Sequence, residues 1–123
     1  MSKQALHTSW NALTPEPLNP LLTRQFVHGE QAMLARICLK KGAIVPRHSH
    51  PNEQITFILE GTLRFLLGDD ETNLQEEIIR AGEVLVIPGN LPHSAEALED
   101  TVDLDLFAPP REDWVNKTDS YLR

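Results

Sequence analysis

Residues 42–61 read G-A-I-V-P-R-H-S-H-P-N-E-Q-I-T-F-I-L-E-G, and the rest of the sequence is best understood outward from this stretch. His48 and His50 are one residue apart, so both rings point to one face if the backbone there is extended. Gln54 has the same even spacing, although Pro51 favours a turn before it. Imidazole nitrogens are common ligands of zinc, nickel, copper and iron, so this face is a candidate metal site. The alternative is a pair of surface histidines in a loop.

The composition is that of one soluble globular domain. The chain has 123 residues, of which 41% are hydrophobic and 24% are charged. Its formal net charge is −7, which argues against non-specific binding of nucleic acid. An anionic substrate would therefore need local positive charge, from a metal or an arginine, to be held.

The sequence has no secretory or membrane-spanning signal. The first ten residues contain no apolar core of a signal peptide, and no apolar run approaches the ~20 residues of a membrane helix. Cys38 is the single cysteine and lies in an apolar run, where a small buried side chain is expected rather than a nucleophile. We expect a cytoplasmic protein that binds neither nucleic acid nor membrane.

Turn residues divide the chain into an arm, a barrel and a tail. Residues 1–23 are predicted to form an N-terminal arm, because its three prolines forbid a regular helix or a central strand. Residues 111–123 are predicted to form a polar C-terminal tail. The barrel between them, residues 24–110, shows short strands separated by glycine and proline turns, which is typical of a β-sandwich or small barrel. The expected strands are 25–28, 32–39, 55–60, 62–67, 73–80, 84–87, 93–98 and 101–107. We expect residues 32–39 to be buried on both faces and residues 84–87 to be buried.

A second segment has the same combination of turn residues and a histidine as the first. Gly82 is followed after five residues by Pro88, and His93 then begins the next expected strand. If this hairpin lies across from the first motif, His93 completes a three-histidine set with His48 and His50. The alternative is a structural histidine within a barrel.

The two segments together resemble the paired motifs of the cupin superfamily. The matching patterns are Gly42-x5-His48-x-His50-x3-Gln54-x6-Gly61 and Gly82-x5-Pro88-x4-His93. This resemblance implies an all-β, jelly-roll-like double-stranded β-helix barrel that holds one divalent metal, with His48, His50, Gln54 and His93 on the ligand positions. It also implies a homodimer in which the N-terminal arm packs on the neighbouring subunit.

Gln54 departs from the family pattern, in which glutamate is the usual ligand. A neutral amide leaves the metal with its full charge, so nickel, zinc, iron or copper is expected in preference to manganese. The amide can bind a metal through its carbonyl oxygen while its NH₂ group donates a hydrogen bond elsewhere. The adjacent Glu53 has the opposite strand parity and is not expected to be a ligand.

The last expected strand carries two acidic residues on one face. Asp103, Asp105 and Phe107 share this face, while Val102, Leu104 and Leu106 share the other. Either the acidic face is solvated, or it lines the barrel interior while the aliphatic face packs on the second sheet. Carboxylates in the interior would be available as general acid or base. Arg111 follows two prolines and is expected either to clamp a substrate carboxylate or to pair at the surface with Glu112 or Asp113.

The set Asp105-x-Phe107-x3-Arg111, together with H-S-H-P-N-E-Q, resembles the KdgF-type cupins of pectin and alginate breakdown. That resemblance implies conversion of 4,5-unsaturated uronates to linear 5-keto-4-deoxyuronate. In this reading Asp105 moves protons, Phe107 walls one face of the sugar, and Arg111 holds the carboxylate. The alternatives are another metal-dependent cupin, such as a dioxygenase, and a non-catalytic cupin that binds a small molecule.

Overall fold

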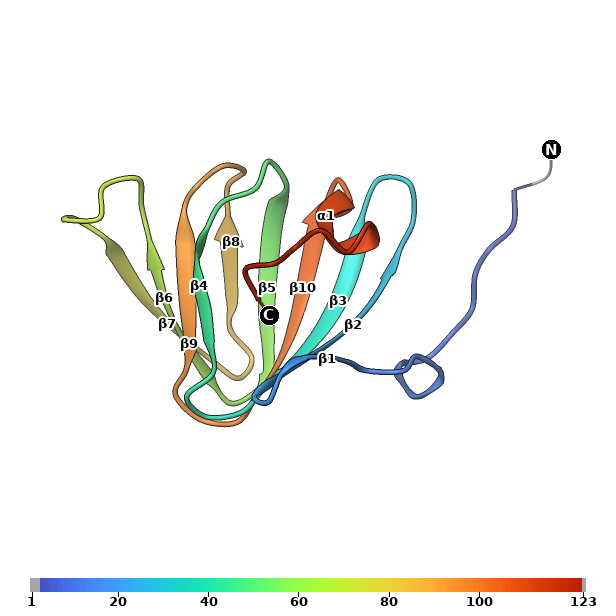
Figure 1. Ribbon diagram of the computed structural model, residues 1–123, viewed down its shortest axis with the longest axis horizontal. Helices are drawn as coiled ribbons and strands as arrows, with labels where there is room; N and C mark the ends of the chain where they lie inside the picture. The colour runs from blue at the N-terminus through green and yellow to red at the C-terminus, as the bar shows by residue number, and fades with distance from the viewer. Residues whose placement is uncertain (1–2, 123) are drawn as a thin grey trace.

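The computed structural model describes residues 3–122, which form two packed antiparallel sheets (Figure 1). The first sheet has the strand order β1-β2-β3-β10-β5-β8 and the second has the order β4-β9-β6-β7. This architecture confirms the all-β, jelly-roll-like fold. The strands are β1 (Glu16–Asn19), β2 (Leu22–His28), β3 (Met33–Leu39), β4 (Ile44–His48), β5 (Glu53–Glu60), β6 (Thr62–Leu67), β7 (Gln75–Arg80), β8 (Val84–Ile87), β9 (His93–Ala97) and β10 (Thr101–Ala108). A 3₁₀ turn, η1 (Trp10–Ala12), precedes them, and one short helix, α1 (Glu112–Val115), follows.

The core lies between the two sheets and is built from one face of each strand. In β3 the odd positions Met33 and Ala35 are buried, whereas Leu34 between them is 37% exposed. The expectation that this strand is buried on both faces is therefore wrong, because the outer face of the six-stranded sheet is open. Strand β8 shows the same correction, since Val84 and Val86 are 55% and 56% exposed.

Strand β10 presents its acidic face to the interior. Asp103, Asp105 and Phe107 are all buried, whereas Leu106 is 38% exposed. The second sheet thus packs against the acidic face, and the expectation that the aliphatic face packs on it is wrong. Because β10 is hydrogen-bonded to β3 and β5 on its two sides, its inward side chains stand in the middle of the larger sheet.

The predicted N-terminal arm contains an edge strand. Strand β1 carries Pro17 and pairs with β2, whose first residue, Leu22, lies within the predicted arm. Pro17 is tolerated because an edge strand leaves one row of its N–H groups unpaired with other strands. Residues 3–9 extend from the body without regular structure (Figure 1).

Gly61 makes the tight turn between β5 and β6, as its sequence position predicted. Its φ is +91°, in the left-handed region that favours glycine, and a Cβ there would overlap the backbone of Asp100 and Thr101. The turn therefore requires glycine, and it sends the chain from the larger sheet into the smaller one.

Strand β4 was not predicted from the sequence. It contains Pro46, and its side chains are exposed or half-buried, so it lacks the alternation by which strands are recognised. It forms the edge of the smaller sheet and ends at His48.

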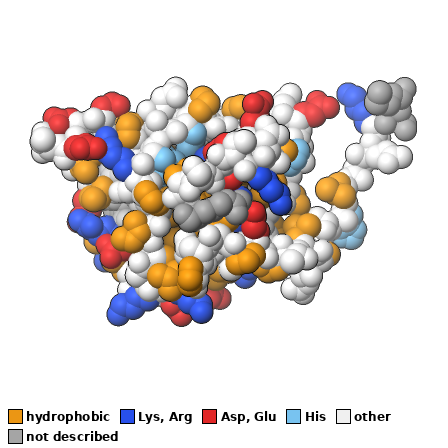
Figure 2. Space-filling model, in the orientation of Figure 1, with side chains coloured by type: hydrophobic (Ala, Val, Ile, Leu, Met, Phe, Trp, Pro, Cys, Tyr) orange, Lys and Arg blue, Asp and Glu red, His pale blue; other side chains and the backbone are white. Residues whose placement is uncertain are grey.

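The molecular surface carries charges of both signs. Figure 2 shows Lys, Arg, Asp and Glu side chains on the face that it draws, including the end formed by β6 and β7. Among residues 3–122, no helix has the length and apolar character needed to span a bilayer.

Candidate metal centre and pocket

Three histidines from two strands and one loop meet inside one end of the barrel. His48 ends β4, His93 begins β9, and the two are register partners in the antiparallel pair. His50 lies in the loop that leads to β5. One ligand nitrogen from each residue lies within 4.8 Å of the others, which is a grouping that can hold a metal ion.

Backbone carbonyl groups orient all three rings. Nδ1 of His48 lies 2.7 Å from the Pro46 oxygen, and the corresponding distances are 3.0 Å for His50 to Asn52 and 2.8 Å for His93 to Leu91. Each Nδ1–H therefore donates, which leaves each Nε2 with a free lone pair. Nε2 of His50 and Nε2 of His93 are buried and have no hydrogen-bond partner. Buried polar atoms without a partner are rare, so the donor set fits a metal ion that would satisfy them.

The histidines are held in the neutral form that a metal requires. Burial, together with the nearby His93, lowers the pKa of His48 from 6.5 to about 3. Burial and then the charge of Arg111 lower the pKa of His50 to about 4, and burial also lowers the pKa of His93. Protons therefore compete weakly with a metal for these nitrogens at neutral pH.

Gln54 lies beside the histidines with its amide already oriented. Its side chain is buried, and Nε2 donates a hydrogen bond of 2.9 Å to Oγ1 of Thr56. Thr56 in turn donates to a carboxylate oxygen of Asp105 at 2.7 Å. Because the NH₂ group is engaged, the amide carbonyl oxygen is the atom left to serve as a ligand.

Two carboxyl groups lie deeper in the barrel. Asp103 and Asp105 are 4% exposed each and are hydrogen-bonded to one another. Burial raises the pKa of both, and the charge of Asp105 raises the pKa of Asp103 further. Hydrogen bonds from Asp103 and Thr56 act in the opposite direction on Asp105. Burial and mutual repulsion therefore favour retention of a proton by the pair, which is a property suited to proton transfer.

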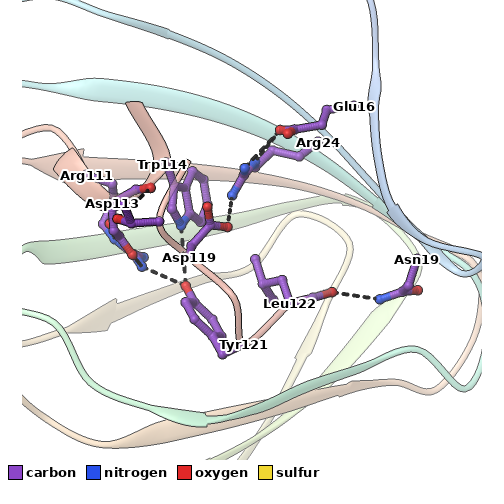
Figure 3. Close-up of polar contacts among 10 residues, drawn as sticks. Glu16, Asn19, Arg24, Arg111, Asp113, Trp114, Asp119, Tyr121 and Leu122 are labelled. Atoms are coloured by element: carbon purple, nitrogen blue, oxygen red, sulfur yellow. Dashed lines mark hydrogen bonds and ion pairs between the residues drawn. The ribbon is translucent and has the colours of Figure 1, made fainter. Parts of the chain in front are cut away.

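Arg111 is a buried residue rather than a surface one. Its Nη2 donates to Asp113 at 2.7 Å and to the Tyr121 hydroxyl at 2.6 Å (Figure 3). Its guanidinium also lies over the rings of Phe107 and Trp114, at 5.1 and 4.7 Å from their centroids. The expected pair with Asp113 is present, but its expected place at the surface is wrong because Arg111 is buried. Arg111 lines the same cavity as His48 and His93, and its role as a clamp for a substrate carboxylate stays a prediction.

Most of the site residues predicted from the sequence line this one cavity. They are His48, Gln54, His93, Asp105, Phe107 and Arg111. His50 completes the cluster by contact, since its ring lies edge-on to His93 and to Phe107 at centroid distances of 5.2 and 5.7 Å. The assignment of metal and catalytic roles to these residues stays a prediction.

Three contributors to the pocket were missed in the sequence. Asn52 donates to the carbonyl oxygens of Pro109 and Pro110, at 2.6 and 3.1 Å, and so ties the His50 loop to the end of β10. Trp114 and Tyr121 lie in the predicted tail, and both line the cavity. Two aromatic residues in a mostly polar tail were the available signal, because such side chains usually find a surface to pack on.

The chain is similar to known proteins of one family. The family model of the cupin domain matches residues 35–108, which is more than half of the chain. This chain is a cupin. A search of curated proteins finds germin-like protein 3-1 of Oryza sativa subsp. japonica, 34% identical over 61 residues, which are 49% of this cupin and 27% of the relative. The chain thus spans about a quarter of the length of that relative.

Solved structures share the fold of this cupin. KdgF from Halomonas sp. superposes with a TM-score of 0.81 at 24% identity, covering 90% of this chain and 99% of that one. A Bacillus subtilis oxalate decarboxylase with Mn(II) centres superposes with a TM-score of 0.78 at 21% identity, covering 89% of this chain and 30% of that one. At these identities the likeness establishes the architecture and leaves the substrate to be argued from the pocket.

Proposed function

We propose that this cupin is a metal-dependent enzyme that opens 4,5-unsaturated uronates of the galacturonate type to linear 5-keto-4-deoxyuronate. One observation carries the proposal: a cluster of three histidines, two of which line the cavity, adjoins the same cavity as the buried carboxyl pair and the buried arginine. The likeness of Asp105-x-Phe107-x3-Arg111 to KdgF-type cupins supports the same substrate class. The substrate is a small sugar acid, and the overall charge of −7 makes the local cation essential for holding it.

The metal would be held by Nε2 of His48, His50 and His93 and by the carbonyl oxygen of Gln54. Nickel, zinc, iron or copper suits three imidazoles and a neutral amide. When bound, such an ion supplies Lewis acidity that polarises a substrate oxygen, without a change of its redox state.

The reaction needs only bond reorganisation and proton movement. Ring opening breaks the bond between C1 and the ring oxygen, which yields an aldehyde at C1 and an enol at C5. The proton lost from the C1 hydroxyl and the proton gained by the enol oxygen balance. The enol then becomes a ketone when its hydroxyl loses a proton and C4 gains one, so substrate and product are isomers.

The chain's own residues divide this work. In this proposal Asp105, which accepts a hydrogen bond from Thr56, takes up and returns the protons. Arg111 offers its guanidinium to the substrate carboxylate, and a bidentate pair would fix the orientation of the ring. Phe107 packs beside both Arg111 and His50, so it walls the pocket and excludes water from the reacting atoms.

Loss of the double-bond absorbance of an unsaturated galacturonate, with the product identified by NMR, tests this function. We expect the metal-loaded protein to accelerate the loss, and Asp105→Ala to return it to the uncatalysed rate. Equal rates with wild type, with Asp105→Ala and without protein would exclude the assignment. Oxygen consumption by an iron-loaded sample would instead identify an oxygen-using cupin.

We also propose that the protein is a homodimer that uses its N-terminal arm. Leu6 in the arm is 77% exposed and borders a shallow groove with Leu34 and Leu106 on the outer face of the larger sheet. Apolar side chains on a projecting segment favour burial against a second copy. Light scattering coupled to size exclusion should give twice the chain mass, and removal of residues 1–9 should shift it to the monomer.

A further inference from the structure

The segment after α1, residues 116–122, turns back across the strands and closes the cavity (Figure 1). Two of its residues, Tyr121 and Leu122, line the cavity wall together with the predicted site residues. The segment contains no helix or strand, so its position depends on side-chain anchors rather than on a backbone ladder.

The first anchor is a buried ion pair 95 residues apart in sequence. Nη1 of Arg24 donates to Asp119 at 2.7 Å, and both side chains have no exposed surface (Figure 3). The Arg24 guanidinium also lies 4.4 Å from the centroid of the Trp114 ring and bonds Glu16 at 2.9 Å. The second anchor is Asn19, whose Nδ2 donates to the Leu122 carbonyl at 3.0 Å. These contacts latch the segment onto β1 and β2.

Tyr121 is held against the site itself. Its ring stacks on His48, with centroids 4.5 Å apart and an interplanar angle of 23°. Its hydroxyl accepts hydrogen bonds from Arg111 at 2.6 Å and from the Trp114 indole at 3.3 Å. The hydroxyl oxygen therefore takes a hydrogen bond that the guanidinium could otherwise donate to an anion.

The space that remains is far too small for a sugar. The cavity offers about 40 Å³ to the centres of water-sized molecules, and one water molecule needs roughly 10–15 Å³ of such space. Pockets that hold small organic ligands measure about 300–1,000 Å³. A uronate therefore enters only if a wall of the cavity moves, and residues 116–122 are a part of that wall that no strand pairing holds in place.

We propose that residues 116–122 are a gate that sets which molecules reach the metal centre, with Tyr121 seated in the position of the substrate's carboxylate. The Arg24–Asp119 pair is its latch. An anion of the correct size displaces the Tyr121 hydroxyl from Arg111, whereas solutes that cannot make this exchange meet the closed gate. The claim that this gate controls access to the metal does not depend on the uronate reaction. The identity of the anion that displaces Tyr121 rests on the proposed function.

Chelator access to the zinc-loaded protein measures the gate without any turnover. Zinc transfer to excess pyridylazoresorcinol is followed by absorbance for wild type, Asp119→Asn and Tyr121→Ala. Both variants should lose zinc at least about tenfold faster, because each raises the fraction of open molecules. Ser120→Ala is the matched control, since Ser120 is exposed between the two, and its rate should stay within about twofold of wild type.

A second measurement addresses the displacing anion. Tyr121→Phe keeps the ring and removes only the hydroxyl, so the gate can close while Arg111 regains a free donor. Calorimetric titration with D-galacturonate should give severalfold tighter binding to this variant than to wild type, whereas Ser120→Ala should bind as wild type does.

The outcomes separate the two claims. Unchanged zinc transfer in Tyr121→Ala, which leaves the latch intact and is the variant less exposed to misfolding, would overturn the gate. Faster transfer with no galacturonate binding to any variant would uphold the gate and refute the uronate as its displacing anion. Faster transfer with tighter binding to Tyr121→Phe would support both.

Discussion

The contribution of His50 to the stability of the metal-free protein should fall steeply as the pH is lowered from 7 to 5. This side chain is 7% exposed, and its pKa lies at about 4, against 6.5 for an unperturbed imidazole. Between these values the unfolded chain binds a proton that the folded protein resists. The contribution of His50 to the free energy of unfolding is therefore fully present above pH 6.5. As the pH falls, this contribution declines until the pH has passed through 4.

The size of the effect follows from the same two values. One pH unit corresponds to about 1.4 kcal/mol for one proton, so the decline from pH 6.5 to pH 5 is about 2 kcal/mol for His50 alone. Asp103 and Asp105 act in the opposite direction, because burial raises the pKa of each carboxyl and protonation then favours the folded state. The contribution of His50 must for this reason be isolated by a variant.

The contribution of His50 can be isolated by urea unfolding. The EDTA-treated wild type and His50→Gln are unfolded at several pH values between 7 and 5. The variant has no imidazole at this position, so its stability should decline by about 2 kcal/mol less over that interval. The comparison uses slopes, which removes any constant cost of the substitution. Parallel curves for the two proteins would refute the claim that His50 is held neutral by burial.

Three further substitutions extend the account. Gln54→Glu should raise the affinity for Mn²⁺ relative to Ni²⁺ by about tenfold or more in competition titrations, because it adds a negative charge to the donor set; an unchanged preference would show that residue 54 is no ligand. Arg24→Gln should destabilise the protein by about 3–5 kcal/mol in chemical unfolding, since it breaks the buried Arg24–Asp119 ion pair by removing one of its members, and a loss below about 1 kcal/mol would contradict this. Asp105→Asn should lower the rate of uronate conversion by about 10²–10⁴-fold while metal content stays constant, and retained activity would reassign the proton carrier.

The parts of the fold that local patterns encode were predictable. Strands β6 and β8 were expected with the bounds they have, because Gly61 and Gly82 mark the turns that precede them. The pairing of the two sequence motifs predicted that His93 would meet His48 and His50, and the structure brings them together. Alternation along one strand does not explain this set, because His50 lies in a loop and Gln54 lies on the other sheet. Strand β4 was missed because Pro46 and its exposed side chains remove the usual alternation.

The orientation of β10 and the closing of the pocket could not be read from the sequence. An alternating Asp and Leu strand has one polar and one apolar face, and only the barrel's polar interior decides that the acidic face points inward. The Arg24–Asp119 pair joins residues 95 positions apart, and no local pattern links them. The role of Tyr121 likewise can be inferred only from its contacts with His48 and Arg111.

The metal centre is the claim on which the rest depends, and its most direct test is a crystal structure with anomalous data collected across the absorption edge of the metal found in the purified protein. We expect one peak per chain, bonded to Nε2 of His48, His50 and His93 and to the carbonyl oxygen of Gln54. A metal bound elsewhere, or a peak that Gln54 does not contact, would contradict this account of the site.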